Sequence, residues 1–599
     1  MRSGDFEARG RTGEDKGWES RSNSLDSRIL RTEDSEFWES PHPGLEHCNS
    51  LPARSNSSSI LYKVRDLILS KSNSESLKYD FQLDGLSESE QNKVIEDLVK
   101  IENDDTMEVD VVDDAPAARD LSELDAVDAK PCDSGETIFE FSKTGPTLKI
   151  AILVVGTRGD VQPFIAVAKR LQEFGHRVRL ATHVNFRNFV QSHGIEFYPL
   201  GGDPQIMAGY MARNKGFLLS GPAEISMQLK QLKEIIFSLL PACTAPDLET
   251  GAPFKAQAII ANPPAYGHTH VAEALGVPLH FLFTMPWTPT NEFPHPMSCV
   301  PNSAANKLSY ILVDLVVWLG IRGFINDFRK KLNLPSIAYF STYYGSISHL
   351  PTGYMWSPYL APKPKDWGFL VDITGFCFLN LGTKYQPQRA FAEWIQQGPK
   401  PIYIGFGSMP LEDGKRTMNI ILEALKETGQ RAIIGRGWGD LGISSDIPAD
   451  VYLIEDCPHD WLFPQCAAVV HHGGAGTTAT GLRSGCPTTI IPFFGDQFFW
   501  GDRIHERGVG PAPIPIYELN VERLSNALRF MLDPEVKLRT MELAKQIENE
   551  NGVVAAVDAF HKHLPAELPI PLVPSDEPPQ QVQWIFQVIE RWCCLPFTL

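Results

Sequence analysis

The chain of 599 residues has no run of about 18 uninterrupted apolar residues, so a transmembrane helix is not expected. The nearest candidate, Tyr310 to Ile321, carries Asp314 in its middle and is interpreted as a buried or interfacial helix. The ten cysteines do not have the spacing of metal ligands, and no signal peptide precedes them. These two observations indicate a reducing compartment with free thiols. An excess of positive charge is also missing: the net charge of −19 argues against nucleic acid as a partner.

Residues 1–145 are rich in Ser, Asp, Glu and Asn, with an acidic cluster from Glu102 to Asp128. Such a segment cannot bury enough apolar surface to offset the entropy lost on ordering, so we expect a disordered extension. One apolar stretch, Ile60 to Leu69, could form a helix against a partner or a membrane. Arg-Ser-Asn-Ser occurs twice, ending at Ser24 and Ser57, which predicts phosphorylation and a phospho-dependent partner, although Ser-rich tails also produce such matches by chance.

From Leu148 the chain changes to short apolar segments that alternate with amphipathic ones. Strands are predicted over residues 148–155, 178–182, 197–200, 258–261, 279–283, 401–406, 432–434, 451–454, 468–470 and 489–491. Continuously apolar strands between helices are typical of parallel sheets covered on both faces. A Pro-rich stretch near Pro358 to Pro387 marks the crossing between two units. The sequence therefore predicts an α/β fold of two facing, doubly wound Rossmann-like domains, with ligand at the carboxyl ends of the strands.

The segment HHGGAGTT, residues 471–478, has the composition of a diphosphate-binding turn. Its glycines let backbone N–H groups approach an anion, and a helix that begins here directs its positive end at phosphate. His472 can donate a ring N–H or, if protonated, supply a positive charge, and Thr477 adds a hydroxyl donor. After the next apolar strand, Asp496 and Gln497 place a carboxylate beside an amide, a pair that suits two adjacent sugar hydroxyls. The two elements together favour a nucleotide sugar over an ordinary Gly-rich turn.

Four segments, in this order, resemble the UDP-glucose-dependent sterol 3-beta-glucosyltransferases of plants, which belong to glycosyltransferase family 1. They are GTRGDVQP at 156–163, GFGSM at 405–409, PHDWL at 458–462, and HHGGAGTT with PFFGDQ at 492–497. The resemblance spans residues 147 to 510 and implies the GT-B fold. It further implies inverting transfer of glucose from UDP-glucose to the 3β-hydroxyl of a membrane sterol, which gives a steryl β-glucoside and UDP.

The resemblance, combined with the residues, assigns the donor site and the domains. Donor-binding residues are expected to be Thr157, Arg158, Gly407, Ser408, His459, His472, Gly474, Gly476, Thr477, Asp496 and Gln497. No Asp-x-Asp lies beside the turn, so neither a metal nor another cofactor is expected. The expected domains are an extension (1–145), an acceptor-binding domain (146–375), a linker (376–398), a UDP-sugar-binding domain (399–565), and a tail with a returning helix (566–599).

The uracil end of the donor is less well defined by the sequence. Related plant enzymes place a tryptophan against uracil where this chain has Glu455 to Pro458, so Trp438 is a candidate stacking surface. The glutamate that grips the ribose in those enzymes is replaced here by Thr480. Trp461 is interpreted as a core residue rather than a donor contact.

Asp160 is the predicted catalytic base, because it stands where the broader family has the histidine of a Gly-His-x-x-Pro motif. A carboxylate can accept the proton of a hydroxyl if partial burial raises its pKa. The alternative is that Asp160 caps the helix that follows. Asn262 replaces the acid that orients the histidine in that family, and it is also a candidate acceptor contact together with His268 and His270, the runners-up for the base.

The acceptor pocket is expected to be apolar. The predicted helices Phe217 to Leu240 and Leu308 to Phe324 are unusually apolar, and Met207, Met211 and Met227 add flexible side chains, although these segments could simply pack on the sheet.

Three alternatives remain open at this stage: glucosylation of a flavonoid, terpenoid or lipid alcohol, a nucleotide-sugar epimerase, and a lipid-binding protein with a vestigial donor site. A sterol acceptor implies a peripheral membrane protein on the cytosolic face of the plasma membrane or endoplasmic reticulum, or a cytoplasmic one. Membrane attachment could use the tail, Tyr310 to Ile321, or Cys593 and Cys594, which could be palmitoylated or merely incidental thiols.

Overall fold

The computed structural model describes residues 147–213, 222–299, 306–337, 349–407, 409, 411–437 and 447–565, with the pairs Lys100–Ile101 and Met107–Glu108. Several predictions fall outside these residues: the remainder of the extension, the phosphorylation motifs, Ser408, Trp438, and the tail with Cys593 and Cys594. The side chain of Met211 is likewise not described. The two pairs form strands β1 and β2, and β2 pairs with β8 (Ser298–Cys299).

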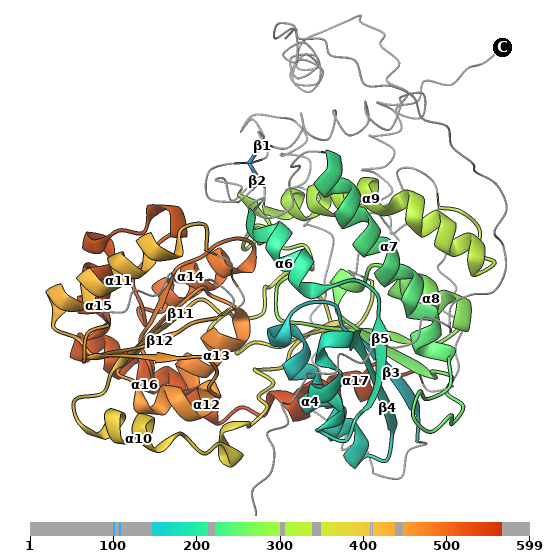
Figure 1. Cartoon of the computed structure of the whole chain (residues 1–599). Helices are drawn as coiled ribbons and strands as arrows, with labels where there is room; N and C mark the ends of the chain where they lie inside the picture. Colours follow the sequence, from blue (N-terminus) through green and yellow to red (C-terminus); the bar gives the residue numbers. More distant parts are fainter. Residues whose placement is uncertain are drawn as a thin grey trace, which may run out of the picture. The chain divides into compact units, whose positions relative to one another are not determined.

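The first large sheet has seven strands, all parallel, in the order β10-β9-β7-β6-β3-β4-β5 (Figure 1). Its strands are β3 (Lys149–Leu153), β4 (Arg177–His183), β5 (Glu196–Leu200), β6 (Ala258–Ala261), β7 (Leu279–Phe283), β9 (Thr352–Tyr354) and β10 (Val371–Ile373). The carboxyl ends of the strands therefore meet at one edge, as predicted for a doubly wound sheet.

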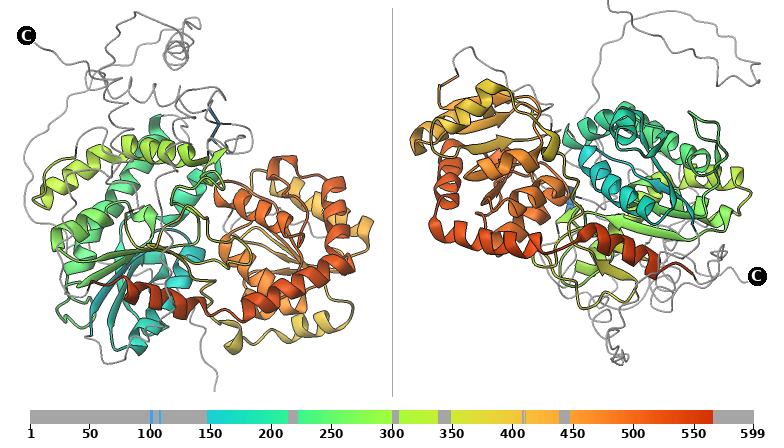
Figure 2. Two further views of the ribbon diagram at one scale, coloured as in Figure 1. Left: turned by 180° about the vertical axis from the view of Figure 1, so that it is seen from behind. Right: turned by 90° about the horizontal axis from the view of Figure 1, so that it is seen from below.

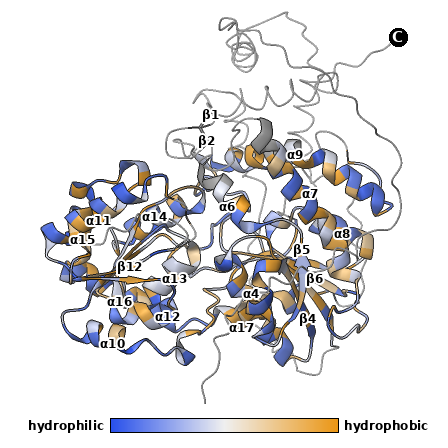
Figure 3. Cartoon of the chain, in the orientation of Figure 1, coloured by the Kyte–Doolittle hydropathy of each residue, from blue (hydrophilic) through white to orange (hydrophobic). Residues whose placement is uncertain are grey.

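Helices cover both faces of this sheet, because the strands are apolar on both sides. In β3, Ile150 and Ile152 pack into the cluster that holds helix α4, whereas Ala151 and Leu153 pack into the cluster on the opposite face. The helices of this part of the chain are α4 (Arg158–Glu173), α5 (Arg187–Gln191), α6 (Pro204–Arg213), α7 (Pro222–Thr244), α8 (His268–Leu275) and α9 (Asn306–Lys331), with short 3-10 turns at Val184–Phe186 and Pro263–Ala265. Figure 3 shows strand β6 in the hydrophobic colour, whereas α9 carries both colours.

The second large sheet has five parallel strands in the order β13-β12-β11-β14-β15. They are β11 (Ile402–Gly405), β12 (Ala432–Gly435), β13 (Val451–Ile454), β14 (Ala468–His471) and β15 (Thr488–Ile490). The accompanying helices are α10 (Arg389–Gln396), α11 (Gly414–Thr428), α12 (His459–Leu462), α13 (Ala475–Arg483), α14 (Asp496–Glu506), α15 (Val521–Met531) and α16 (Pro534–Glu548), with 3-10 turns at Gly382–Lys384, Phe463–Gln465 and Ile516–Glu518. The βα alternation confirms the predicted second Rossmann-like unit.

Helix α17 (Gly552–Lys562) packs against α4 and so joins the first sheet rather than the second (Figure 2). Its residues Ala556, Val557 and Phe560 are buried in the cluster that contains Phe164 of α4. His561 Nε2 lies 3.0 Å from His176 Nε2, so the end of the helix contacts the turn that follows α4. A helix that returns to the first sheet is thus formed by α17, within the segment 399–565 that was expected to belong to the UDP-sugar-binding domain. The expected helix at Gln583 to Cys594 lies outside the described residues.

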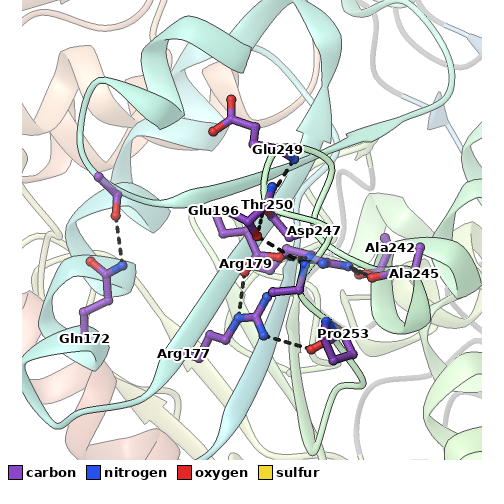
Figure 4. A network of polar contacts seen from close by, with 12 residues as sticks. Gln172, Arg177, Arg179, Glu196, Ala242, Ala245, Asp247, Glu249, Thr250 and Pro253 are labelled. Atoms are coloured by element: carbon purple, nitrogen blue, oxygen red, sulfur yellow. Dashed lines mark hydrogen bonds and ion pairs between the residues drawn. The ribbon is translucent and has the colours of Figure 1, made fainter.

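A buried arginine joins α7 to strands β4 and β5. The Arg179 guanidinium pairs with Glu196, with 2.6 Å between Nε and Oε1, and Nη1 donates to the carbonyls of Ala242 and Ala245 at 3.1 and 2.7 Å (Figure 4). It also lies 3.8 Å from the ring centre of Phe254. The positive charge therefore meets the carbonyls at the negative end of α7, an arrangement that stabilises the helix terminus.

The described helices include none that is both long and apolar enough to cross a membrane.

Candidate active site

The turn after β3 carries the predicted base. Thr157 is the N-cap of α4, and Asp160 occupies the third helical position, from which its Oδ2 accepts the Thr157 backbone N–H at 2.7 Å. The Thr157 hydroxyl also donates to Oδ2, at 3.2 Å. Asp160 is therefore not the N-cap itself, as the alternative reading had it. Asp160 is the acidic N3 residue of a capping box: its side chain accepts a hydrogen bond from the backbone of the N-cap residue, which fixes the position of the carboxyl group.

Gly156 makes this arrangement possible. It has a φ of +144°, and a Cβ at this position would lie 2.3 Å from Asp160 Oδ2. The glycine is therefore required both by its backbone conformation and by the close approach of the carboxylate.

Asn262 fixes the same turn from the neighbouring strand. It is fully buried, its Oδ1 accepts the Val155 N–H at 3.1 Å, and its Nδ2 donates to the Val155 carbonyl at 2.7 Å. The oxygen and the nitrogen of the side-chain amide thus both hydrogen-bond to the backbone of the residue before Gly156. The structure gives Asn262 a positioning role, which differs from the acceptor contact expected from the sequence.

The charge of Asp160 acts on the carboxyl group of Asp496. Burial raises the pKa of Asp160, although its hydrogen bonds with Thr157 oppose this. Burial, followed by the negative charge of Asp160, raises the pKa of Asp496 to about 7, whereas the hydrogen bond from Trp500 Nε1 at 3.0 Å lowers it. The structure therefore brings the predicted base and the predicted sugar-binding acid into one electrostatic environment.

The start of α13 has the geometry of an anion-binding terminus. The helix begins at Ala475 with Gly474 as its N-cap and no side-chain cap, so its first N–H groups are not satisfied within the helix. The helix includes the predicted residues Gly476 and Thr477. The Thr480 hydroxyl donates to the Gly476 carbonyl at 2.9 Å, so it is used within the helix.

The His472 ring lies between two glycines. A Cβ on Gly474 would lie 2.6 Å from His472 Nε2, and one on Gly407 would lie 3.1 Å from its Cε1. Burial lowers the pKa of His472 to about 4, so the ring is neutral at pH 7. His472 can thus contribute an N–H donor, whereas the positive charge considered from the sequence is disfavoured.

Arg158 and His459 come together near the start of α12. Arg158 Nη1 lies 3.6 Å from Asp456 Oδ2, and Arg158 lowers the pKa of His459. His459 is stacked on Phe463 with 4.5 Å between ring centres, and its Nε2 lies 3.3 Å from the Tyr403 hydroxyl. Burial is the main reason that the pKa of His459 is lowered to about 4, so this ring is also neutral at pH 7. Its contacts are those of a packed side chain.

The side chain of Gln497 hydrogen-bonds to the backbone of the loop that precedes it. Its Oε1 accepts the backbone N–H of Phe493 at 2.7 Å and of Phe494 at 3.4 Å, and its Nε2 lies 3.4 Å from Met409 Sδ. The side chain is buried, so its contact with a sugar stays a prediction. Asp496, at the first position of α14, is only partly buried.

A mainly apolar cavity lies beside the carboxyl end of β6 in the first sheet. Its free space is about 30 Å³, and its lining comes from the turn after β6, from α8, from the segment after β7, and from α9. The lining residues are Pro263, Tyr266, His268, His270, Trp287, Asp314, Val317, Trp318, Ile321 and Ile325. The predicted segment Leu308 to Phe324 therefore contributes to this wall, and Pro263 directly follows Asn262.

His268 and His270, the alternative candidates for the catalytic base, line this cavity. Both rings contact other groups of the protein. His268 Nδ1 accepts the Thr269 N–H at 2.8 Å, and its Nε2 lies 3.2 Å from the Pro263 carbonyl. His270 Nδ1 lies 3.0 Å from Arg329 Nη1. Burial lowers the pKa of His268 to about 3 and that of His270 well below its ordinary value, which disfavours either ring as a proton acceptor.

Sequence reasoning missed Tyr266, Trp287 and Asp314 as site residues. Asp314 was noted only as the charge that interrupts an apolar run, and that interruption was the available signal. Tyr266 has a φ of +51°, which is unusual for a bulky residue and often marks a functional turn. In the described part of the chain, no group of three or more His, Cys, Asp or Glu side chains has the geometry to hold a metal ion.

Comparisons with known proteins agree with this geometry. The glycosyltransferase family 28 N-terminal domain matches residues 150–294, and the C-terminal domain of proteins like erythromycin biosynthesis protein CIII matches residues 421–556. The fold resembles the crystal structure of the glycotransferase of kitacinnamycin, with a TM-score of 0.53 and 17% identity over 70% of this chain and 100% of that one.

Full-length relatives are more informative. The chain is 63% identical to sterol 3-beta-glucosyltransferase UGT80B1 of Arabidopsis thaliana, over 93% of this chain and 92% of the relative. It is 55% identical to UGT80A2 of the same plant, over 81% and 76% of the two chains, and 37% identical to a sterol 3-beta-glucosyltransferase of Yarrowia lipolytica, over 69% and 28%. With two Rossmann-like units in the GT-B arrangement and this similarity along almost its whole length, the chain belongs to the family of sterol 3-beta-glucosyltransferases.

Proposed function

We propose that this enzyme transfers glucose from UDP-glucose to the 3β-hydroxyl of a sterol, with inversion at the anomeric carbon. The observation that carries the proposal is the carboxyl group of Asp160, fixed by a capping box after β3 and electrostatically coupled to Asp496. The identity with the Arabidopsis enzymes supports the sterol as acceptor and glucose as the sugar.

The donor diphosphate binds at the start of α13. Its first N–H groups, the Thr477 hydroxyl and the neutral His472 ring supply hydrogen-bond donors where negative charge develops on the leaving UDP. Gly474 and Gly407 keep the space around the His472 ring clear of side chains. Asp496 binds a glucose hydroxyl, either accepting from it or, when protonated, donating to it.

Asp160 accepts the proton of the acceptor hydroxyl through Oδ1, since the hydrogen bonds with Thr157 use Oδ2. The acceptor oxygen then bonds to the anomeric carbon while the bond from that carbon to the diphosphate oxygen breaks, and the bonding electrons leave with UDP. A single displacement of this kind inverts the configuration and gives the β-glucoside from an α-linked donor. The raised pKa of Asp160 suits a group that must hold a proton transiently.

The acceptor binds where α9 meets the turn after β6, and the small cavity there must widen to admit it. Pro263, in its wall, follows Asn262, whose amide holds the backbone that leads into Gly156 and Asp160. The cavity and the base are therefore attached to adjacent strands at the same edge of the sheet. Because a sterol resides in a bilayer, we also propose peripheral association with a membrane; the phospho-dependent partner stays a prediction.

Asp160→Asn is the decisive variant, because it keeps the shape of the side chain but removes the base. We expect glucosylation of sitosterol by purified enzyme to fall by at least about a thousandfold, while the affinity for UDP, measured by calorimetry, stays unchanged. Retained turnover would place the base elsewhere.

The anomeric proton coupling in the wild-type product tests inversion. A panel of sterol, flavonoid, terpenoid and long-chain alcohol acceptors separates the proposal from a glucosyltransferase of another apolar acceptor. Release of an altered sugar without acceptor would indicate an epimerase, and absence of UDP binding a vestigial site.

A further inference from the structure

Asp496, the proposed sugar-binding acid, is itself held by a tryptophan of the same helix. Trp500 stands one helical turn after Asp496 in α14, and its Nε1 donates to Asp496 Oδ2 at 3.0 Å. This bond restrains rotation of the carboxyl group, because one of its two oxygens is tied to the indole N–H. The direction of the other oxygen, Oδ1, therefore depends on the position of the Trp500 ring.

The Trp500 ring is in turn fixed by a residue of the first Rossmann-like unit. It is fully buried and meets the ring of Trp356 edge to face, with 5.7 Å between the ring centres. Trp356 is also fully buried; it follows β9 by two residues and is stacked on Tyr354, with 4.4 Å between the ring centres. Because buried aromatic rings pack closely and in preferred orientations, the Trp500 indole has little freedom to turn.

A second aromatic contact attaches the same helix to the first unit. Phe499 of α14 packs against Phe293, in the segment after β7, with 5.1 Å between the ring centres, and against Trp500 with 4.9 Å. Strands β7 and β9 are parallel to β3, so the segments that follow them leave the sheet at the edge where Asp160 lies. The helix that carries Asp496 is thus attached to the edge that carries the proposed base, and the charge of Asp160 accordingly raises the pKa of Asp496.

Sugar binding by Asp496 requires this kind of support. Asp496 is the first residue of its helix and is partly exposed, a position in which an unrestrained side chain samples several rotamers. Hydrogen bonds to a sugar hydroxyl weaken steeply when their angle is poor. A carboxyl group that is already oriented before the sugar arrives loses less conformational entropy on binding, so the contact contributes more to affinity.

We propose that Trp500 is a positioning residue for recognition of the donor sugar: its indole N–H holds Asp496 in the orientation that binds a hydroxyl group of the hexose, and its packing on Trp356 makes this orientation depend on the first unit. The inference rests on the proposed function, in which Asp496 binds the glucose. Because Trp500 is fully buried, it acts through Asp496 and does not touch the donor.

The test compares the dissociation constants of UDP-glucose and UDP, measured by calorimetry without acceptor. UDP lacks the hexose, so the ratio of the two constants isolates the contribution of the sugar. Trp500→Phe keeps an aromatic ring but removes the N–H that holds Asp496. It should weaken binding of UDP-glucose about tenfold and leave binding of UDP unchanged. Trp356→Phe keeps the hydrogen bond but loosens the packing, and should weaken UDP-glucose by a smaller factor.

The matched control is Trp367→Phe, the same substitution in the same aromatic cluster. Trp367 Nε1 donates to the Pro289 carbonyl at 3.1 Å, and its ring lies 6.3 Å from that of Trp356. This variant also loses a hydrogen bond of a buried indole, so its melting temperature should fall, but the ratio of the two dissociation constants should stay at the wild-type value.

Asp496→Ala separates the inference from the proposed function. If Asp496 binds the sugar, this variant raises the ratio of the UDP-glucose to the UDP dissociation constant, and addition of Trp500→Phe raises it no further. An unchanged ratio in Asp496→Ala would refute the proposed sugar contact itself.

A raised ratio in Asp496→Ala with a wild-type ratio in Trp500→Phe would overturn only the positioning role. A purely structural Trp500 would alter the ratio no more than Trp367→Phe does, or would alter it further in the Asp496→Ala background, and either result contradicts the proposal. If Trp500→Phe does not fold, as judged by its melting curve, Trp356→Phe takes its place, and a wild-type ratio in that variant counts against the inference.

Discussion

Replacement of Gly156 by alanine adds one carbon atom next to Asp160, the proposed base, and leaves every functional group in place. The added Cβ would lie 2.3 Å from Asp160 Oδ2 and 2.5 Å from its Cγ. The backbone φ of +144° is in addition a conformation that L side chains rarely adopt.

The structure allows the size of the effect to be worked out. A real Cβ contact is essentially never shorter than 3.0 Å, so the carboxyl group or the helix start must move by at least about 0.7 Å. That movement lengthens the 2.7 Å hydrogen bond from the Thr157 N–H, which is worth roughly 1.5–3 kcal/mol because its acceptor is charged. The strained backbone adds about 1–3 kcal/mol. A displacement of about 1 Å at a reacting group typically lowers the rate about a hundredfold.

We therefore expect Gly156→Ala to lower kcat by about two orders of magnitude and to reduce stability by about 2.5–6 kcal/mol. The UDP dissociation constant should change little, because the proposed donor contacts come mainly from α13 and α14. Steady-state kinetics with UDP-glucose and a detergent-dispersed sterol, calorimetry with UDP and thermal melting give the three quantities.

Gly159→Ala is the matched control. The nearest atom to its added Cβ would be Thr157 Oγ1, at an ordinary contact distance of 3.7 Å, so near wild-type activity is expected. A Gly156→Ala enzyme with wild-type kcat would refute the argument, because it would show that the capping-box position of Asp160 does not matter for transfer.

Two further predictions concern charged groups. Burial and Asp160 raise the pKa of Asp496 to about 7 in the folded protein, above the value of about 3.9 in an unfolded chain, so ionisation of Asp496 destabilises the fold as the pH rises through 7. Asp496→Asn should thus melt at a higher temperature than the wild type at pH 8 and equally near pH 4; a variant that is less stable at pH 8 would contradict the assignment. Arg179→Met leaves the carbonyls at the end of α7 buried without their donor, whereas Glu196 keeps its pair with Arg177; the free energy of unfolding should fall by about 2–4 kcal/mol in urea titrations. The exposed Arg187→Met serves as its control, with an expected change within about 0.5 kcal/mol.

The sheets were largely predictable because their strands are continuous apolar runs between helices. The predicted strand 258–261 matches β6 to the residue, and 178–182 lies within β4. Strands β9 and β10 were missed, since three residues are too few to show a period, and β10 lies within the Pro-rich stretch that was taken for the crossing between domains. Short edge strands of this kind are defined by their neighbours rather than by their own sequence.

The site was predictable where a motif fixes the local backbone, and less so where tertiary packing decides. Asp160, His472 and Gly474 lie at strand-to-helix turns, as their glycine patterns indicated. The buried contacts of Asn262 and Gln497 could not be foreseen. Asn262 contacts backbone that is 107 residues away in the sequence, and Gln497 contacts a loop that turns back on its side chain. The cavity could not be foreseen either, since its lining comes from four separate segments.

The contact between α17 and α4 has a consequence for biosynthesis. The apolar surface of the helix that carries Asp160 is covered by Ala556, Val557 and Phe560, which leave the ribosome roughly four hundred residues later. The first Rossmann-like unit cannot complete its core when its own strands have been made. Its core closes only when nearly the whole polypeptide has been made. A product truncated before Gly552 therefore exposes an apolar surface on the helix that carries Asp160, and we expect it to be bound by chaperones or degraded rather than released as a partly active enzyme.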